Sequence, residues 1–346
     1  GTVDMDANED VPLGGVTTTN AGATAVTVTS TSGGVVDGGD TDTDITANSG
    51  TVVIDAVTGV GSTNAIDTQI DTLDLDNTTS GNVDINETDA LDINELDQDA
   101  PTGTVNVDAG GTITVVDALA GVSGLAGQVE LDADGVDSSI AVNASVTSTS
   151  GDINVLADND VTFDATSDVS TTSGNVTVTA DVDTAADSGG TDQGALTMAD
   201  GAVINAGSGT VDMDANEDVT LGGVSTTNAT GTAVTVTSVA GGVVDGGDTD
   251  TDITANSGTV VIDAVTGVGD AGAIDTQIDT LDLDNTTNGN VDINEIDALD
   301  INQLDQDAAA GTVNVDAGGT ITVVAAQSGV TGTAGQVELD ADGAAS

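Results

Sequence analysis

The sequence of 346 residues contains no lysine, arginine or histidine, while 60 of its residues are aspartate or glutamate. Proteins that bind nucleic acids neutralise phosphate groups with lysine and arginine, so this function is excluded. The same absence argues against binding to an anionic membrane surface. With a formal net charge of −60, the chain must instead attract cations from solution.

Cysteine is also absent, which excludes disulfide bonds, cysteine-based metal sites and thiol redox chemistry. No apolar run approaches the roughly 20 residues that a membrane-spanning helix needs, so we expect no membrane insertion. The sequence starts with Gly1 and shows no signal peptide. We therefore expect an internal piece of a longer chain, or a processed product.

Aromatic residues are almost missing, because Phe163 is the only one in the chain. Large aromatic side chains usually fill much of a globular core. Here the apolar residues are nearly all valine, isoleucine, leucine and alanine. These small side chains, many of them β-branched, favour a thin interior built in layers of β-structure.

What the sequence does contain is one short segment repeated many times. It has a glycine, a small polar residue and then alternating apolar and polar residues, as in Gly1-Thr-Val-Asp-Met-Asp-Ala7. A period of two places one face of a strand in a core and the other in solvent, so each copy predicts a short β-strand. The glycine predicts a tight corner before the strand, where a positive φ costs little. The copies lie at 1–7, 50–56, 81–86, 103–109, 127–133, 151–157, 174–180 and 209–215.

A longer regularity covers the whole chain. Gly1 corresponds to Gly209, and residues 33–61 are identical to residues 241–269, so the repeat is 208 residues long. We predict one complete unit at 1–208 and the first part of a second, nearly identical unit at 209–346, joined in one continuous rod. Neither end differs in character from the rest, which indicates a window of a longer array.

Within the unit, the copies from Gly81 to Gly174 follow one another at intervals of 22 to 24 residues. Strands and glycine corners with this period are typical of a β-solenoid. We therefore predict an all-β parallel β-helix of about 13–15 coils with almost no helix, in which equivalent side chains stack in columns about 4.8 Å apart. The step of 49 residues from Gly1 to Gly50 predicts two coils, and the step of 31 to Gly81 predicts one coil with a longer loop.

These copies, together with Asn77-Thr-Thr-Ser-Gly-Asn-Val-Asp-Ile-Asn-Glu87, resemble the repeat regions of large secreted bacterial adhesins of the filamentous-haemagglutinin type. The resemblance covers essentially the whole chain. It implies a right-handed parallel β-helix, a location outside the cell or on its surface, and a role as a stalk or adhesive fibre. The chain departs from that pattern in lacking every basic residue and in having so long a repeat unit.

The segment Gly38-Gly-Asp-Thr-Asp-Thr-Asp44, repeated at 246–252, is the best candidate for a metal site. Its acidic residues alternate with threonine, so in an extended segment all three carboxylates would point to one side, and hard oxygen ligands beside a glycine turn suit Ca²⁺. A solvated acidic loop would have the same sequence, and the spacing matches neither the calcium-binding nonapeptide repeat nor an EF-hand. The candidate ligands are Asp40, Asp42, Asp44, Asp248, Asp250 and Asp252.

We do not expect an enzyme. The only common mechanism open to acidic residues alone is hydrolysis of a sugar by two carboxylates, and nothing in the sequence singles out a pair. We expect a structural and adhesive segment of a long extracellular bacterial fibre or cell-surface stalk, with an acidic coat that cations screen. Its expected partners are further copies of itself, stacked end to end, and a host or biofilm surface. The alternative is a surface module that binds Ca²⁺ or a glycan through its Asp-rich loops.

Several asparagines lie in sequons for N-glycosylation, which places them at candidate attachment sites if the protein is exported. They are Asn77, Asn143, Asn175, Asn228 and Asn285.

Overall fold

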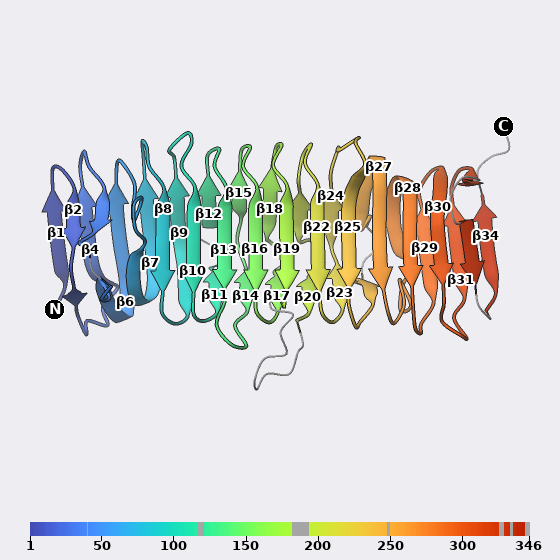
Figure 1. Ribbon diagram of the computed structural model, residues 1–346, viewed down its shortest axis with the longest axis horizontal. Helices are drawn as coiled ribbons and strands as arrows, with labels where there is room; N and C mark the ends of the chain where they lie inside the picture. Colours follow the sequence, from blue (N-terminus) through green and yellow to red (C-terminus); the bar gives the residue numbers. More distant parts are fainter. Residues whose placement is uncertain are drawn as a thin grey trace.

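The computed structural model describes residues 1–39, 41–116, 121–181, 194–247, 250–324, 329–332 and 335–342. The chain coils about 14 times around one axis and forms a rod, with its N-terminal and C-terminal turns at opposite ends (Figure 1). The strands pair in parallel, and the described ranges contain no helix. The predicted parallel β-solenoid and its number of coils are therefore confirmed. No helix that could span a membrane occurs in these ranges.

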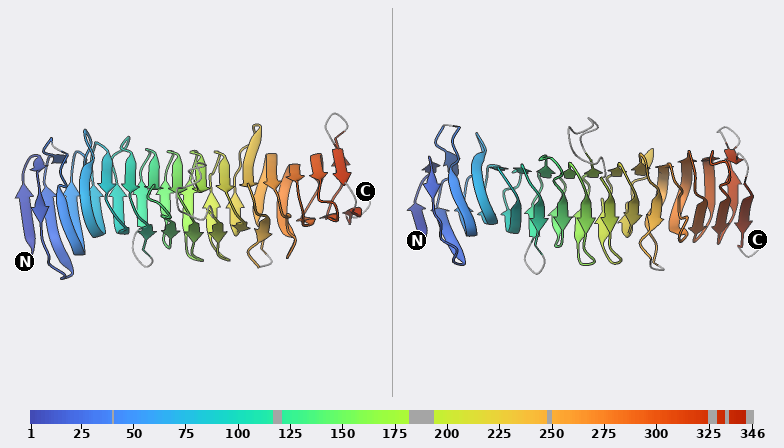
Figure 2. Two further views of the ribbon diagram at one scale, coloured as in Figure 1. Left: turned by 60° about the horizontal axis from the view of Figure 1, so that its bottom comes forward. Right: turned by 90° about the horizontal axis from the view of Figure 1, so that it is seen from below.

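Two ladders of parallel strands run along the whole rod, and a third, shorter ladder covers its middle part (Figure 2). The first ladder, which begins with β1, contains β1 (Val3–Ala7), β4 (Thr24–Ser30), β6 (Ile45–Ala56), β7 (Ile66–Asn77), β9 (Leu91–Gln98), β12 (Gly121–Gly124), β15 (Val146–Ser148), β18 (Asp168–Thr171), β21 (Val203–Asn205), β24 (Gly223–Ser225), β27 (Ile253–Ala264), β28 (Ile274–Asn285), β29 (Val291–Glu295), β31 (Val313–Ala317) and β34 (Val337–Ala341). The second ladder, which contains β22, comprises β3 (Val16–Thr17), β8 (Val83–Glu87), β10 (Val105–Ala109), β13 (Val129–Ala133), β16 (Ile153–Ala157), β19 (Val176–Ala180), β22 (Val211–Ala215), β25 (Thr232–Ser238), β30 (Leu299–Gln306) and β33 (Gly329–Gly332), together with parts of β6, β7, β27 and β28. The third ladder contains β11 (Ile113–Val115), β14 (Ile140–Val142), β17 (Val161–Phe163), β20 (Leu196–Met198), β23 (Val219–Leu221) and β26 (Val243–Asp245). Near the N-terminus β2 (Val11–Leu13) and β5 (Val35–Asp37) form a separate two-stranded sheet, and near the C-terminus β32 (Ile321–Val323) pairs with β30.

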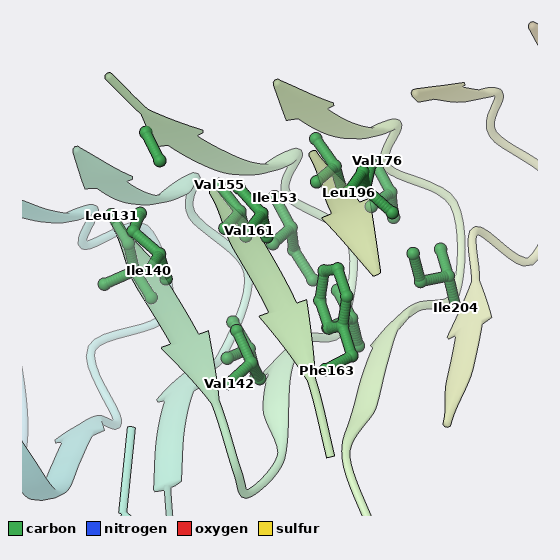
Figure 3. Close-up of a cluster of buried hydrophobic side chains, with 14 of the residues drawn as sticks. Leu131, Ile140, Val142, Ile153, Val155, Val161, Phe163, Val176, Leu196 and Ile204 are labelled. Atoms are coloured by element: carbon green, nitrogen blue, oxygen red, sulfur yellow. The ribbon is translucent and has the colours of Figure 1, made fainter. Parts of the chain in front are cut away.

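The core is a set of apolar columns between these ladders. Along each strand, buried and partly exposed residues alternate, as the period of two predicts. Figure 3 shows buried side chains from successive turns packed together, among them Leu131 and Val155 from neighbouring strands. The one aromatic residue, Phe163, is 2% exposed and stacks between Val142 and Met198. The small side chains therefore fill a narrow interior that needs no large aromatic residues.

Most of the glycines that lead the strands are needed because adjacent turns pack closely there, and only some of them have a positive φ. The predicted positive φ is confirmed at Gly50 and Gly81, both at 83°, but is wrong for the leading glycines from Gly103 to Gly209. There, a methyl group in place of the Cα hydrogen would overlap the carbonyl oxygen of the leading glycine one turn earlier, as between Gly151 and Gly127. Glycine is required because the backbones of adjacent turns nearly touch at this corner.

The glycine-led strands do not all lie in one column. In the first ladder β1 pairs with β4, β4 with β6, and β6 with β7, so three turns separate β1 from β7. The next copy, β8, pairs with the first half of β7 on the second ladder, through Ile66 and Ile85. Five further turns on that ladder lead from β8 to β22. With the half turn between β7 and β8, the unit of 208 residues makes eight and a half turns.

Long strands cause this change of ladder. β6 and β7 have 12 residues each and bend around a corner, so the turn that follows has two long sides. On one side β8 stacks over both Val60 and the first half of β7. On the other side β9 stacks over the second half of β7 and then divides between β11 and β12. The step of 31 residues therefore holds one and a half turns, and the prediction of one coil with a longer loop is wrong.

The second unit repeats the change at β28, β29 and β30. As a result β1 and its copy β22 lie on opposite sides of the rod, and their arrows point in opposite directions in Figure 1. Two complete units of this kind would make 17 turns and would restore the original side. Equivalent loops of successive units must therefore face opposite ways.

Spin labels test this geometry directly, and the absence of native cysteine keeps the labelling specific. Thr79 and its copy Thr287 are both exposed. Thr79 follows a strand of the first ladder and Thr287 follows a strand of the second, so we expect them on opposite edges of the rod. Eight and a half turns separate them by about 41 Å along the axis. Ala298 is exposed and follows a first-ladder strand, on the edge of Thr79 and nine turns away. Pulsed electron spin resonance should give a longer distance for Thr79→Cys/Thr287→Cys than for Thr79→Cys/Ala298→Cys. The reverse order would mean that copies share one side.

Candidate functional site

Rows of carboxylates run along the outside of the ladders. In the first ladder Asp55, Asp76 and Asp97 are in register in three successive turns. Burial, and then the charges of Asp97 and Asp55, raise the pKa of Asp76. Its copy Asp284 has a raised pKa for the same two reasons. The Oδ1 atom of each of these two residues is buried and accepts no hydrogen bond from the described part of the chain.

A second acidic row crosses the second ladder at Asp108 and Asp132. Burial, followed by the charge of Asp108, raises the pKa of Asp132 to about 6. Two unit charges at the spacing of adjacent turns repel each other by roughly 1 kcal/mol in water and by more near a protein surface. Since the chain has no lysine or arginine, cations from solution must reduce this repulsion.

Asparagine relieves the repulsion where it alternates with an acid. In the row next to Asp108, Asn106 Nδ2 donates to Asp84 Oδ1 at 3.0 Å. Two turns further along, Asn154 Nδ2 donates to Glu130 Oε2 at 2.9 Å. The amide thus provides the donor that a lysine or arginine would provide elsewhere, without adding a charge. Acidic residues that stack directly on one another lack this donor.

One glutamate of each unit lies inside the rod. Glu87 is 1% exposed, and burial raises its pKa to about 7. Its Oε2 accepts hydrogen bonds from Thr68 Oγ1 at 2.7 Å and Ile70 N at 3.1 Å, and its Oε1 accepts one from Asp89 N at 3.2 Å. These donors favour the ionised form, but burial outweighs them.

The second unit builds the same buried carboxyl site around Glu295, with donors from Thr276, Ile278 and Asp297. This site is not among those predicted from the sequence. The sequence feature that could have predicted this site is the last position of the glycine-led copy, which is Glu87 in one turn and Ala109 in the next. A glutamate in a column of alanines indicates a buried acid.

A buried amide pair closes the corner before β8. Asn77 Oδ1 accepts from Gly59 N at 2.9 Å, and Asn77 Nδ2 donates to Gln98 Oε1 at 2.8 Å. Gln98 Nε2 donates in turn to Gly81 O at 3.2 Å. Both side chains are 0% exposed, so their role is to satisfy backbone groups at the change of ladder. Asn77 and its copy Asn285 are therefore inaccessible as glycosylation sites in the folded chain.

The Asp-rich loops separate their acidic residues. Asp42 is exposed, whereas Asp44 is buried and its Oδ2 accepts a hydrogen bond from Asp67 N at 3.2 Å. The second unit shows the same arrangement at Asp250 and Asp252. This differs from the expectation that alternate side chains share one side, because the chain enters β6 and turns Asp44 inward. Asp40 and Asp248 lie outside the described residues, so the Ca²⁺ site stays a prediction.

Within the described ranges no three acidic side chains are grouped so as to hold a metal ion. The sequence matches no protein-family model, no curated protein and no solved structure. What the molecule does is therefore inferred from its geometry and its charge.

Proposed function

We propose that this chain is a structural segment of a long extracellular bacterial fibre or cell-surface stalk with an adhesive role. The supporting observation is that all three ladders cross the boundary between the two units without a break. β19 pairs with β22, β20 with β23, and β21 with β24. Hydrogen bonds between turns then run along the axis, so a tensile load is shared by every strand pair of a turn.

The charge distribution supports the same role. A net charge of −60 keeps separate rods apart and soluble, and divalent cations link them where acidic rows meet. The half-integral number of turns places equivalent loops on alternate sides of the rod, which suits a fibre that meets partners on both sides. The resemblance to the repeat regions of filamentous-haemagglutinin-type adhesins agrees with this proposal.

Antibody labelling of the producing cells tests the proposal. Gold-labelled antibodies against the chain should decorate filaments outside intact cells in electron micrographs. Axial averaging of those filaments should give a repeat of about 82 Å, which corresponds to two units, with a subsidiary spacing of about 41 Å. Labelling that requires permeabilised cells would contradict the proposal.

Salt should raise the melting temperature gradually, because the acidic rows respond to charge screening. We expect NaCl and CaCl₂ at equal ionic strength to raise it in the same smooth manner, with the larger rise for Ca²⁺. The melting temperature followed by circular dichroism, with EDTA as the starting point, measures this. A sharp stoichiometric Ca²⁺ effect that disappears in the variant Asp42→Asn/Asp250→Asn would instead favour the Asp-rich loops as dedicated calcium sites.

A further inference from the structure

One row of the first ladder changes from acidic to uncharged partway along the rod. Asp55, Asp76 and Asp97 are followed in register by Ser123 in β12. The row then continues through the outward side chains of the next four strands of this ladder. They are Thr147, Ser170, Asn205 and Ser225. In a chain with 60 acidic residues, five successive turns thus present one hydroxyl or amide side chain each.

This uncharged row lies in a groove. A hollow of about 600 Å³ spans β12, β15, β18 and the end of β21, and a second hollow of about 280 Å³ continues from Asn205 toward β27. Among the residues that the structure describes, Asp99 at one end is the only charged one that lines the first hollow, and none lines the second. The groove therefore runs along the axis of the rod and crosses its strands.

Hydrogen-bonding groups in the groove are available to a ligand. The hydroxyls of Thr147 and Ser170 make no hydrogen bond to the described residues, and neither do those of Thr149 and Thr172 in the adjacent row. A hydroxyl both donates and accepts, so a pair of such rows matches a ligand whose surface is also made of hydroxyls. The turns repeat at about 4.8 Å, which is close to the length of one sugar unit in an extended β-linked glycan.

Other ligand classes fit less well. Anionic polymers are repelled by the net charge of −60, and cationic ones are drawn to the acidic rows rather than to an uncharged groove. An apolar partner would find only Leu125 among the exposed side chains of the described residues that line the first hollow. We propose that the groove binds an uncharged, extended β-linked polysaccharide chain parallel to the rod axis. This binding site goes beyond the fibre role and is distinct from the Asp-rich loops.

Calorimetric titration of the full chain with cellohexaose tests the proposal. Without aromatic rings for stacking, each sugar contributes little, so we expect a dissociation constant on the order of 1 mM that does not change with NaCl concentration. Cellobiose, which spans too few turns, should bind at least about tenfold more weakly. Maltohexaose, whose chain coils, should also bind at least about tenfold more weakly.

Two matched double variants test whether cellohexaose binds in this groove. Thr147→Val/Ser170→Ala removes hydroxyls from the groove while keeping the shape of the strands, and should weaken cellohexaose binding at least about tenfold. Thr177→Val/Thr179→Val makes a similar change on β19 in the second ladder and should leave binding unchanged. Circular dichroism and urea midpoints verify that both variants fold. The proposal is overturned if cellohexaose does not bind, if maltohexaose binds equally well, or if both variants bind like the native chain. The fibre proposal would survive each of these results.

Discussion

We expect the chain to resist urea better as the pH falls from about 8 to about 4.5, whereas many proteins are destabilised by acid. Ten carboxyl groups, among them Glu87 and Asp132, have a pKa above its ordinary value, and burial is the first cause in each of them. A group with a raised pKa binds its proton more tightly in the folded chain than in the unfolded one. Its stabilising contribution is complete below the unfolded pKa and is lost as the pH rises through the folded pKa.

Glu87 sets the upper part of this pH range. Its pKa rises from an ordinary value of 4.5 to about 7, so its contribution disappears between these two values as the pH increases. Since one pH unit corresponds to about 1.4 kcal/mol, this one buried group changes the free energy of unfolding by about 3 kcal/mol. Glu295 adds an effect of the same sign in the second unit. Asp132, whose pKa is about 6, extends the effect toward lower pH.

Urea unfolding followed by circular dichroism at several pH values measures the effect. In the double variant Glu87→Gln/Glu295→Gln, the dependence of the midpoint on pH between about 5 and 7 should become much flatter. The exposed Glu9, changed to glutamine, serves as the control and should leave that part of the profile as it is. If the urea midpoint of the native chain falls as the pH is lowered through this range, the carboxyl groups are not buried without a positively charged partner, and the prediction is wrong.

The substitution Gly151→Ala should be among the most damaging single changes that the chain can undergo. The added methyl group would overlap the carbonyl oxygen and carbon of Gly127, which belong to the backbone of the preceding turn. A flexible side chain could move aside, but a backbone carbonyl held in a ladder cannot move without separating the turns. We expect a loss of about 3 kcal/mol, at the upper end of what overpacking usually costs.

Gly14→Ala provides the matched control. No heavy atom lies within 4 Å of a methyl group at Gly14, and its φ is not positive. This substitution should change the free energy of unfolding by no more than about 0.5 kcal/mol. The urea midpoints of Gly151→Ala and Gly14→Ala, measured under the same conditions, test this difference. Equal midpoints would show that adjacent turns are not packed as closely as the glycine column requires.

The candidate sites differ in how far the sequence could predict them. The rows of acidic residues follow from strand alternation combined with the 22 to 24 residue period, and Asp108 and Asp132 do stack in register. The buried Glu87 and Asn77 were not predicted, because both are polar residues that usually lie at the surface. Their burial depends on donors and acceptors supplied by other turns, such as Ile70 N and Gly59 N.

The sequence by itself determined the parallel coil, the apolar columns and the acidic exterior. Those properties follow from alternation within a strand and from a short repeat, both of which can be seen in neighbouring residues. Only the tertiary structure decided that β8 leaves the column of β1 and joins the second ladder. The pairing partner of β8 depends on which strand of the preceding turn is long enough to extend beneath it. This pairing joins residues that are far apart in the chain. The same non-local pairing turns Asp44 inward and gives the unit its extra half turn.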